Sequence, residues 1–107
     1  MELNSLYNIA EKEKIKIYNW EIENVNGMYL EYKKNKAIAI NYDNIKNNYD
    51  EKCTLAEELG HYYMNATYPA SCTDKIIIHK QEYRAKKWSY TMLIPYEDLK
   101  SAVKNRI

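Results

Sequence analysis

The chain has 107 residues, of which 46% are hydrophobic and 29% are charged. This length and balance are typical of one small globular domain and exclude a disordered polymer. Sixteen basic and fifteen acidic side chains give a formal net charge of +1, which excludes bulk electrostatic attraction as a basis for binding nucleic acid or an anionic membrane.

The chain contains no recognisable targeting or membrane segment. Residues 1–14 include no unbroken apolar stretch, and no later run approaches membrane-spanning length. Its two cysteines, Cys53 and Cys72, are too few for a disulfide framework and lack the close pairing of a cysteine-based zinc site. We therefore expect a cytoplasmic protein with reduced thiols.

The N-terminal half predicts one helix and a small sheet. Apolar residues at three- and four-residue spacing predict an amphipathic helix at 3–14. β-branched and aromatic residues then predict strands at 15–20, 28–32 and 37–42. A polar turn at 33–36 joins the last two strands, so a mainly antiparallel sheet is expected.

The C-terminal half predicts helices. Asn48 and Glu51 resemble a capping box that begins a helix from about Tyr49 to Asn65. Residues 67–73 predict a loop, while 75–79 fits either a short extended piece or the approach to the next helix.

A further helix is expected from Gln81 to about Leu93, because Pro95 cannot continue a helical hydrogen-bond ladder. A last short helix is expected from Tyr96 to Asn105. The order of elements predicts an α+β fold.

Three residues of the helix at 49–65 form a constellation suited to metal chemistry. Glu57 and His61 are four residues apart, so they lie within about 40° of each other on one helix face. Two side chains on adjacent turns can coordinate one metal ion. Glu58 projects about 60° from His61, which places it beside such an ion as a general base for a water molecule.

Other interpretations remain open from these residues alone. Adjacent glutamates are common on a solvated helix face, and His79 or the Cys53 thiolate are further candidate ligands. The glycine inside the helix, Gly60, predicts close contact with another helix. The hydroxyl groups of three tyrosines are candidates for stabilising an oxyanion, although these rings also suit a core: Tyr62, Tyr63 and Tyr90.

Two segments resemble the ImmA/IrrE family of zincin-like metallopeptidases, especially its short phage and mobile-element members. Leu55–His61 (LAEELGH) resembles the family's variant of the H-E-x-x-H helix, and Glu82–Pro95 (EYRAKKWSYTMLIP) resembles its downstream helix. The resemblance implies a single small zincin-like domain over residues 1–107 and a metal-dependent endopeptidase.

Carried over residue by residue, the resemblance makes Glu57 and His61 metal ligands, Glu58 the catalytic base and Glu82 the third ligand. Glu57 departs from the motif, which has histidine there. Many members have an acid immediately before the alanine of the second segment, where this chain has Arg84. The resemblance therefore assigns the ligand role to Glu82 as the available carboxylate.

The departure at Glu57 affects the metal and the expected activity. Two carboxylates and one imidazole leave a zinc centre about one positive charge lower than two imidazoles and one carboxylate do, and they favour harder ions. The resemblance thus implies Zn²⁺, with Mn²⁺ or Mg²⁺ as competitors. The implied partner is a protein, such as a phage-type helix-turn-helix repressor. The alternatives are an inactive zincin scaffold that binds a repressor and a structural metal-binding domain.

Overall fold

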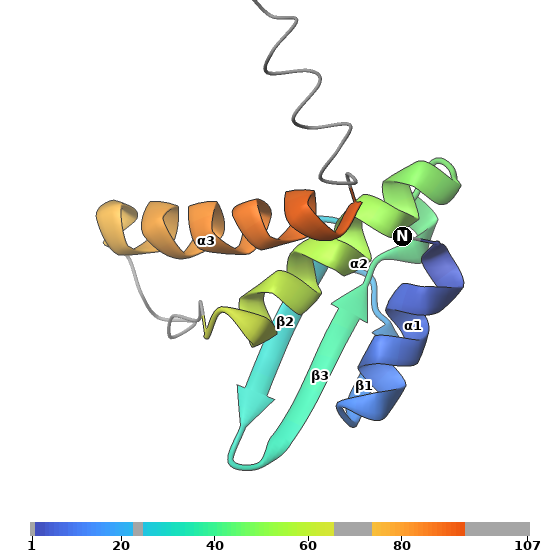
Figure 1. Ribbon diagram of the computed structural model, residues 1–107, viewed down its shortest axis with the longest axis horizontal. Helices are drawn as coiled ribbons and strands as arrows, with labels where there is room; N and C mark the ends of the chain where they lie inside the picture. Colours follow the sequence, from blue (N-terminus) through green and yellow to red (C-terminus); the bar gives the residue numbers. More distant parts are fainter. Residues whose placement is uncertain (1, 23–24, 66–73, 94–107) are drawn as a thin grey trace, which may run out of the picture.

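The computed structural model describes residues 2–22, 25–65 and 74–93 (Figure 1). The loop predicted at 67–73, the helix predicted from Tyr96 to Asn105 and Cys72 all lie outside these residues. Within them the α+β class is confirmed. The elements are α1 (Leu3–Lys12), β1 (Ile15–Asn19), β2 (Gly27–Tyr32), β3 (Asn35–Ile40), a 3₁₀ turn (Tyr42–Asn44), α2 (Asn48–Tyr63) and α3 (Lys75–Leu93).

The sheet is mixed, because β3 lies between a parallel and an antiparallel neighbour. The strand order is β1-β3-β2, in which β1 runs parallel to β3 and β2 runs antiparallel to it. The prediction of mainly antiparallel pairing therefore describes only the β2–β3 hairpin, whose tight turn places Lys33 at a φ of 58°. Because β1 takes the far side of β3, β2 is left as an edge strand.

The hydrophobic core lies between one face of the sheet and the helices α1 and α2 (Figure 1). Apolar side chains alternate along the strands toward this face, which explains why the helices pack there. The largest fully buried side chains are Leu6, Ile38, Ile40, Leu55 and Leu59. No helix among the described residues is long and apolar enough to cross a membrane.

The helix α2 begins one residue earlier than predicted. Asn47, and not Asn48, is the N-cap: its backbone is extended, with φ −162° and ψ 178°, and its side chain accepts a hydrogen bond of 2.9 Å from the Asp50 amide. Asp50 in turn accepts a hydrogen bond of 3.1 Å from the Lys46 amide. These two hydrogen bonds cap the start of the helix, the role that the sequence suggested for Asn48 and Glu51, although Asp50 bonds to the Lys46 amide and not to that of the N-cap residue.

Candidate metal centre

The core fixes the orientation of α2. Leu55 and Leu59 are fully buried against the sheet and α1. The same helix carries Glu58 and His61, which are only 8% and 6% exposed, while Glu57 is half-buried. Burying an ionisable side chain is costly unless it has a charge partner or a ligand. The three polar residues therefore indicate a specific site and not a solvated face.

Gly60 allows α3 to cross α2 in close contact. A Cβ atom at Gly60 would overlap the carbonyl oxygen of Ala85 and would lie 3.1 Å from the Ala85 Cα. Ala85 is itself fully buried. The close helix contact predicted for Gly60 is confirmed, and this crossing brings the Glu82 turn of α3 alongside His61.

Three possible ligands converge at the crossing. One donor atom from each of Glu57, His61 and Glu82 lies within 4.8 Å of the others. The His61 Nε2 and Glu82 Oε1 atoms are 3.3 Å apart. Ligands about 2.0–2.2 Å from a tetrahedral zinc ion would be roughly 3.3–3.5 Å from one another. The pair is thus spaced as two ligands of one ion would be, and the donor set of nitrogen and carboxylate oxygen suits zinc.

The electrostatics of these side chains also suit a cation. Burial raises the pKa of Glu57 above its ordinary range, the positive charge of Lys86 opposes this rise, and the neighbouring Glu82 carboxylate adds to it. Burial likewise raises the pKa of Glu58 to about 7, an effect that His61 opposes and that both neighbouring glutamates reinforce. A divalent ion would relieve this repulsion among buried carboxylates.

A cleft of about 1130 Å³ opens beside these residues. One wall is the edge strand β2 from Gly27 to Glu31, and the other carries Glu57, Glu58 and His61 of α2 with Glu82 of α3. A Cβ atom at Gly27 would lie 2.8 Å from Thr54 Cγ2 and 3.2 Å from Glu58 Cγ, so only glycine lets the strand approach α2 this closely.

Two residues of β2 at this cleft were not among the predicted site residues. Gly27 begins the strand, and Tyr29 lines the cleft. Tyr29 also contributes a backbone hydrogen bond to the Glu58 carboxyl group. Strand alternation shows which face a residue occupies, but it carries no signal for which strand approaches the helix.

The two other candidate ligands lie outside the converging group. His79 belongs to α3, which begins at Lys75, but its side chain is exposed. Cys53 lines the cleft one turn before Glu57 and is half-buried with a free thiol. Among the described residues, the cluster able to hold a metal ion consists of Glu57, His61 and Glu82.

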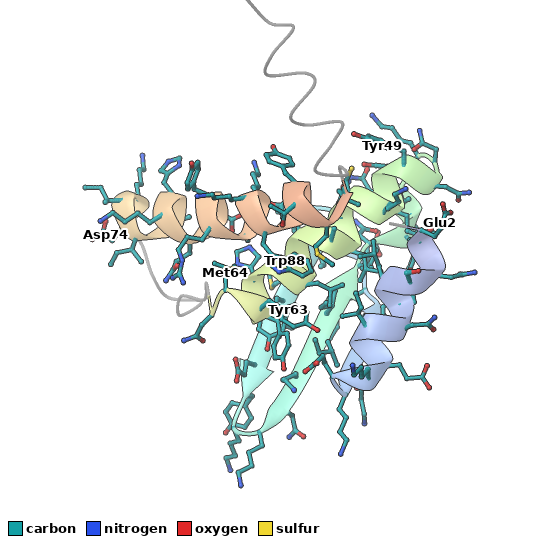
Figure 2. All side chains as sticks on the ribbon, in the orientation of Figure 1. Glu2, Tyr49, Tyr63, Met64, Asp74 and Trp88 are labelled. Carbon is teal, nitrogen blue, oxygen red and sulfur yellow. The ribbon has the colours of Figure 1, made fainter. Side chains whose placement is uncertain are left out.

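The three tyrosines considered for an oxyanion role do not line the cleft. The Tyr62 hydroxyl donates a hydrogen bond of 2.7 Å to Glu13. Tyr63 stacks on Trp88 with ring centroids 5.0 Å apart; both residues are labelled in Figure 2. Tyr90 is 54% exposed on α3. The prediction of a core role is confirmed for Tyr62, which packs against the core, and is wrong for Tyr63 and Tyr90, which are 41% and 54% exposed.

Comparison with known proteins agrees with this geometry. A family model described as Peptidase M78, IrrE N-terminal-like domain, matches residues 10–107, which is most of the chain. No curated protein and no solved structure matched. The matched range contains α2, α3 and every residue of the candidate centre. The chain therefore belongs to the Peptidase M78 family of IrrE N-terminal-like, metallopeptidase-type domains.

Proposed function

We propose that this chain is a metal-dependent endopeptidase in which Glu57, His61 and Glu82 hold a divalent ion and Glu58 is the general base. The observation that carries the proposal is the convergence of donor atoms from two helices within 4.8 Å of one another. Membership of a metallopeptidase-type family supports it independently.

When bound, the ion would polarise the scissile carbonyl group and lower the pKa of a water molecule. Glu58 supplies the proton transfer. In the metal-free site burial raises its pKa to about 7. Its carboxylate would accept a proton from the attacking water and then return it to the departing amine. Its burial beside Gly27 and Thr54 restricts the carboxyl group to the floor of the cleft.

The proposed substrate is a protein that presents an extended segment. β2 is an edge strand along the cleft, and such an edge can bind a peptide by main-chain hydrogen bonds. Resemblance to the short phage and mobile-element members supports a helix-turn-helix repressor as that protein. We place the reaction in the cytoplasm, where such a repressor acts.

The proposed ion is Zn²⁺, although Glu57 alters the competition among metals. A second carboxylate in place of histidine makes the ligand set harder, so Mn²⁺ should compete more effectively than at a centre with two histidines. The same substitution supports a second candidate function. With a second carboxylate ligand, a metal-bound water would be less acidic and a weaker source of hydroxide. The domain would then bind a repressor without hydrolysing it.

Two measurements on native protein test the proposal. Protein purified without chelator should contain about one divalent ion per chain, and Glu82→Gln should lose most of it. The native protein should also cleave a repressor encoded beside it, whereas Glu58→Gln should bind metal but leave the repressor intact. Glu11→Gln, which changes an exposed glutamate on α1, is the matched control and should behave as native.

The outcomes separate the candidate functions. Repressor retained intact by both native protein and Glu58→Gln would support the binding scaffold. Equal cleavage by both would rule out Glu58 as the base. An absence of bound zinc, manganese and magnesium at equimolar concentrations would sink any hydrolytic mechanism through this centre.

A further inference from the structure

Arg84 occupies the position where many family members carry an acid, yet it lies at the end of α2 and not at the candidate metal centre. Its Nη2 atom donates a hydrogen bond to the carbonyl oxygen of Met64, the C-cap residue of α2. Its Nη1 atom donates a second bond of 3.1 Å to Gln81 Oε1. The last carbonyl groups of a helix have no partner within the helix, so Arg84 supplies one from α3.

The angular positions around α3 show what this bond restrains. Taking Ala85 at the contact with Gly60 as the reference, Glu82 lies about 60° to one side and Arg84 about 100° to the other. The ligand and the tether therefore lie on opposite flanks of the contact at Gly60. Separating this turn of α3 from α2 would stretch the Arg84–Met64 hydrogen bond.

Other contacts also hold α3 against α2, and Trp88 and Leu93 pack against the core. α3 buries only Ala85 and Ser89 among its residues. Trp88 stacks on Tyr63 on the flank of Arg84, beside Met64 in Figure 2, but it lies more than a turn beyond Glu82. Arg84 is two residues from the third ligand, closer along the helix than Trp88 is.

We propose that Arg84 is a positioning residue that holds the Glu82 carboxylate at the metal centre by tying α3 to the C-terminal end of α2. This role rests on the proposed function, because that proposal names Glu82 as a metal ligand. The contact between Glu82 and His61, 3.3 Å between Oε1 and Nε2, is a property of the two side chains and can be followed in metal-free protein.

The test compares three variants by Zn²⁺ affinity, measured in competition with a chromogenic chelator. Arg84→Met should weaken binding about 10-fold, as second-layer changes at metal sites do. Arg84→Lys, which retains a donor, should recover most of that loss. Lys87→Met removes an equal charge from an exposed site on the same helix and should leave the affinity unchanged. Removing a positive charge near a cation should by itself strengthen Zn²⁺ binding. Weaker binding by Arg84→Met would therefore indicate that Arg84 positions Glu82.

A second measurement separates this proposal from the proposed function. In metal-free protein, the ¹⁵N resonances of the His61 imidazole should shift in Arg84→Met toward those of Glu82→Gln. Unchanged His61 resonances, or equal Zn²⁺ affinity for native protein and Arg84→Met, would overturn the positioning role. If native protein bound no metal while the His61 shift appeared, the proposed function would fail and the tether would stand.

Discussion

The two long helices of this domain are held in very different ways. Seven of the sixteen residues of α2 are buried, compared with two of the nineteen residues of α3. Glu57, Glu58 and His61 therefore stand on a helix embedded in the core, whereas Glu82 stands on a helix that reaches the core only through its crossing at Ala85 and through partly buried side chains such as Trp88 and Leu93. The difference teaches that the proposed centre depends on core packing for two ligands and on the α2–α3 contact for the third.

The largest expected effect compares a buried side chain of α2 with an exposed apolar side chain of α3. Leu59→Ala on α2 should lower the free energy of unfolding by about 2–5 kcal/mol, because it deletes a fully buried side chain. Ile76→Ala on α3, which is 68% exposed, should change it by less than about 0.5 kcal/mol. Urea denaturation measures both, and similar losses would contradict the contrast between the helices.

The pH dependence of folding stability measures what the burial of Glu58 on α2 costs. Burial raises the pKa of Glu58 from an ordinary 4.5 to about 7. As pH rises through this interval the unfolded chain releases the proton before the folded one does, so the stability of metal-free protein should fall. The Glu58 contribution is complete below pH 4.5 and is lost by about pH 7, on the order of 3 kcal/mol. Subtracting the curve for Glu58→Gln should isolate this slope, and parallel curves would show that Glu58 titrates normally.

The crossing itself is tested by Gly60→Ala. The added methyl group would overlap the Ala85 backbone, so α3 should move away from α2 at a cost of about 1–3 kcal/mol. Zn²⁺ binding should weaken together with stability. Adding Ala85→Gly should not restore either property, because the obstructing atoms belong to the main chain. Recovery in this double variant would mean that the contact is between side chains.

The smallest effects concern the helix caps. Asn47→Ala should lower the free energy of unfolding by about 1 kcal/mol, because it removes the N-cap of the core helix. Asp74 accepts hydrogen bonds from the Ile76 and Ile77 amides at 3.0 Å and 3.4 Å. Asp74→Ala should mainly speed hydrogen exchange in that first turn of α3, since few buried groups depend on it. A global loss equal to that of Asn47→Ala would contradict the comparison.

The sequence predicted the α2 side of the site better than the α3 side. The spacing of Glu57, Glu58 and His61 defines a helix face, and the interior glycine at Gly60 correctly indicated a close helix contact. Both inferences depend only on local helix geometry. The choice between His79 and Glu82 could not come from spacing, because it depends on which face of α3 meets α2.

The secondary-structure preferences of single residues were also misleading where tertiary contacts determine the structure. Three successive isoleucines at 76–78 are β-branched and suit a strand, yet they form the first turn of α3, where Asp74 caps the helix and Ile78 lines the cleft. The parallel pairing of β1 with β3 likewise could not be predicted, because the alternation of apolar and polar residues along a strand does not reveal the direction of its neighbour. Asn47 and Asn48 are the same residue type, so only the extended backbone of Asn47 identifies the cap.

Anomalous diffraction at the zinc absorption edge, from crystals grown with one equivalent of Zn²⁺, tests the central claim most directly. If these three residues hold the ion, one peak should lie at the α2–α3 crossing, with His61 Nε2 and carboxylate oxygens of Glu57 and Glu82 each about 2.0–2.2 Å from it. A peak elsewhere, or an ion at His61 that lacks either carboxylate, would contradict it.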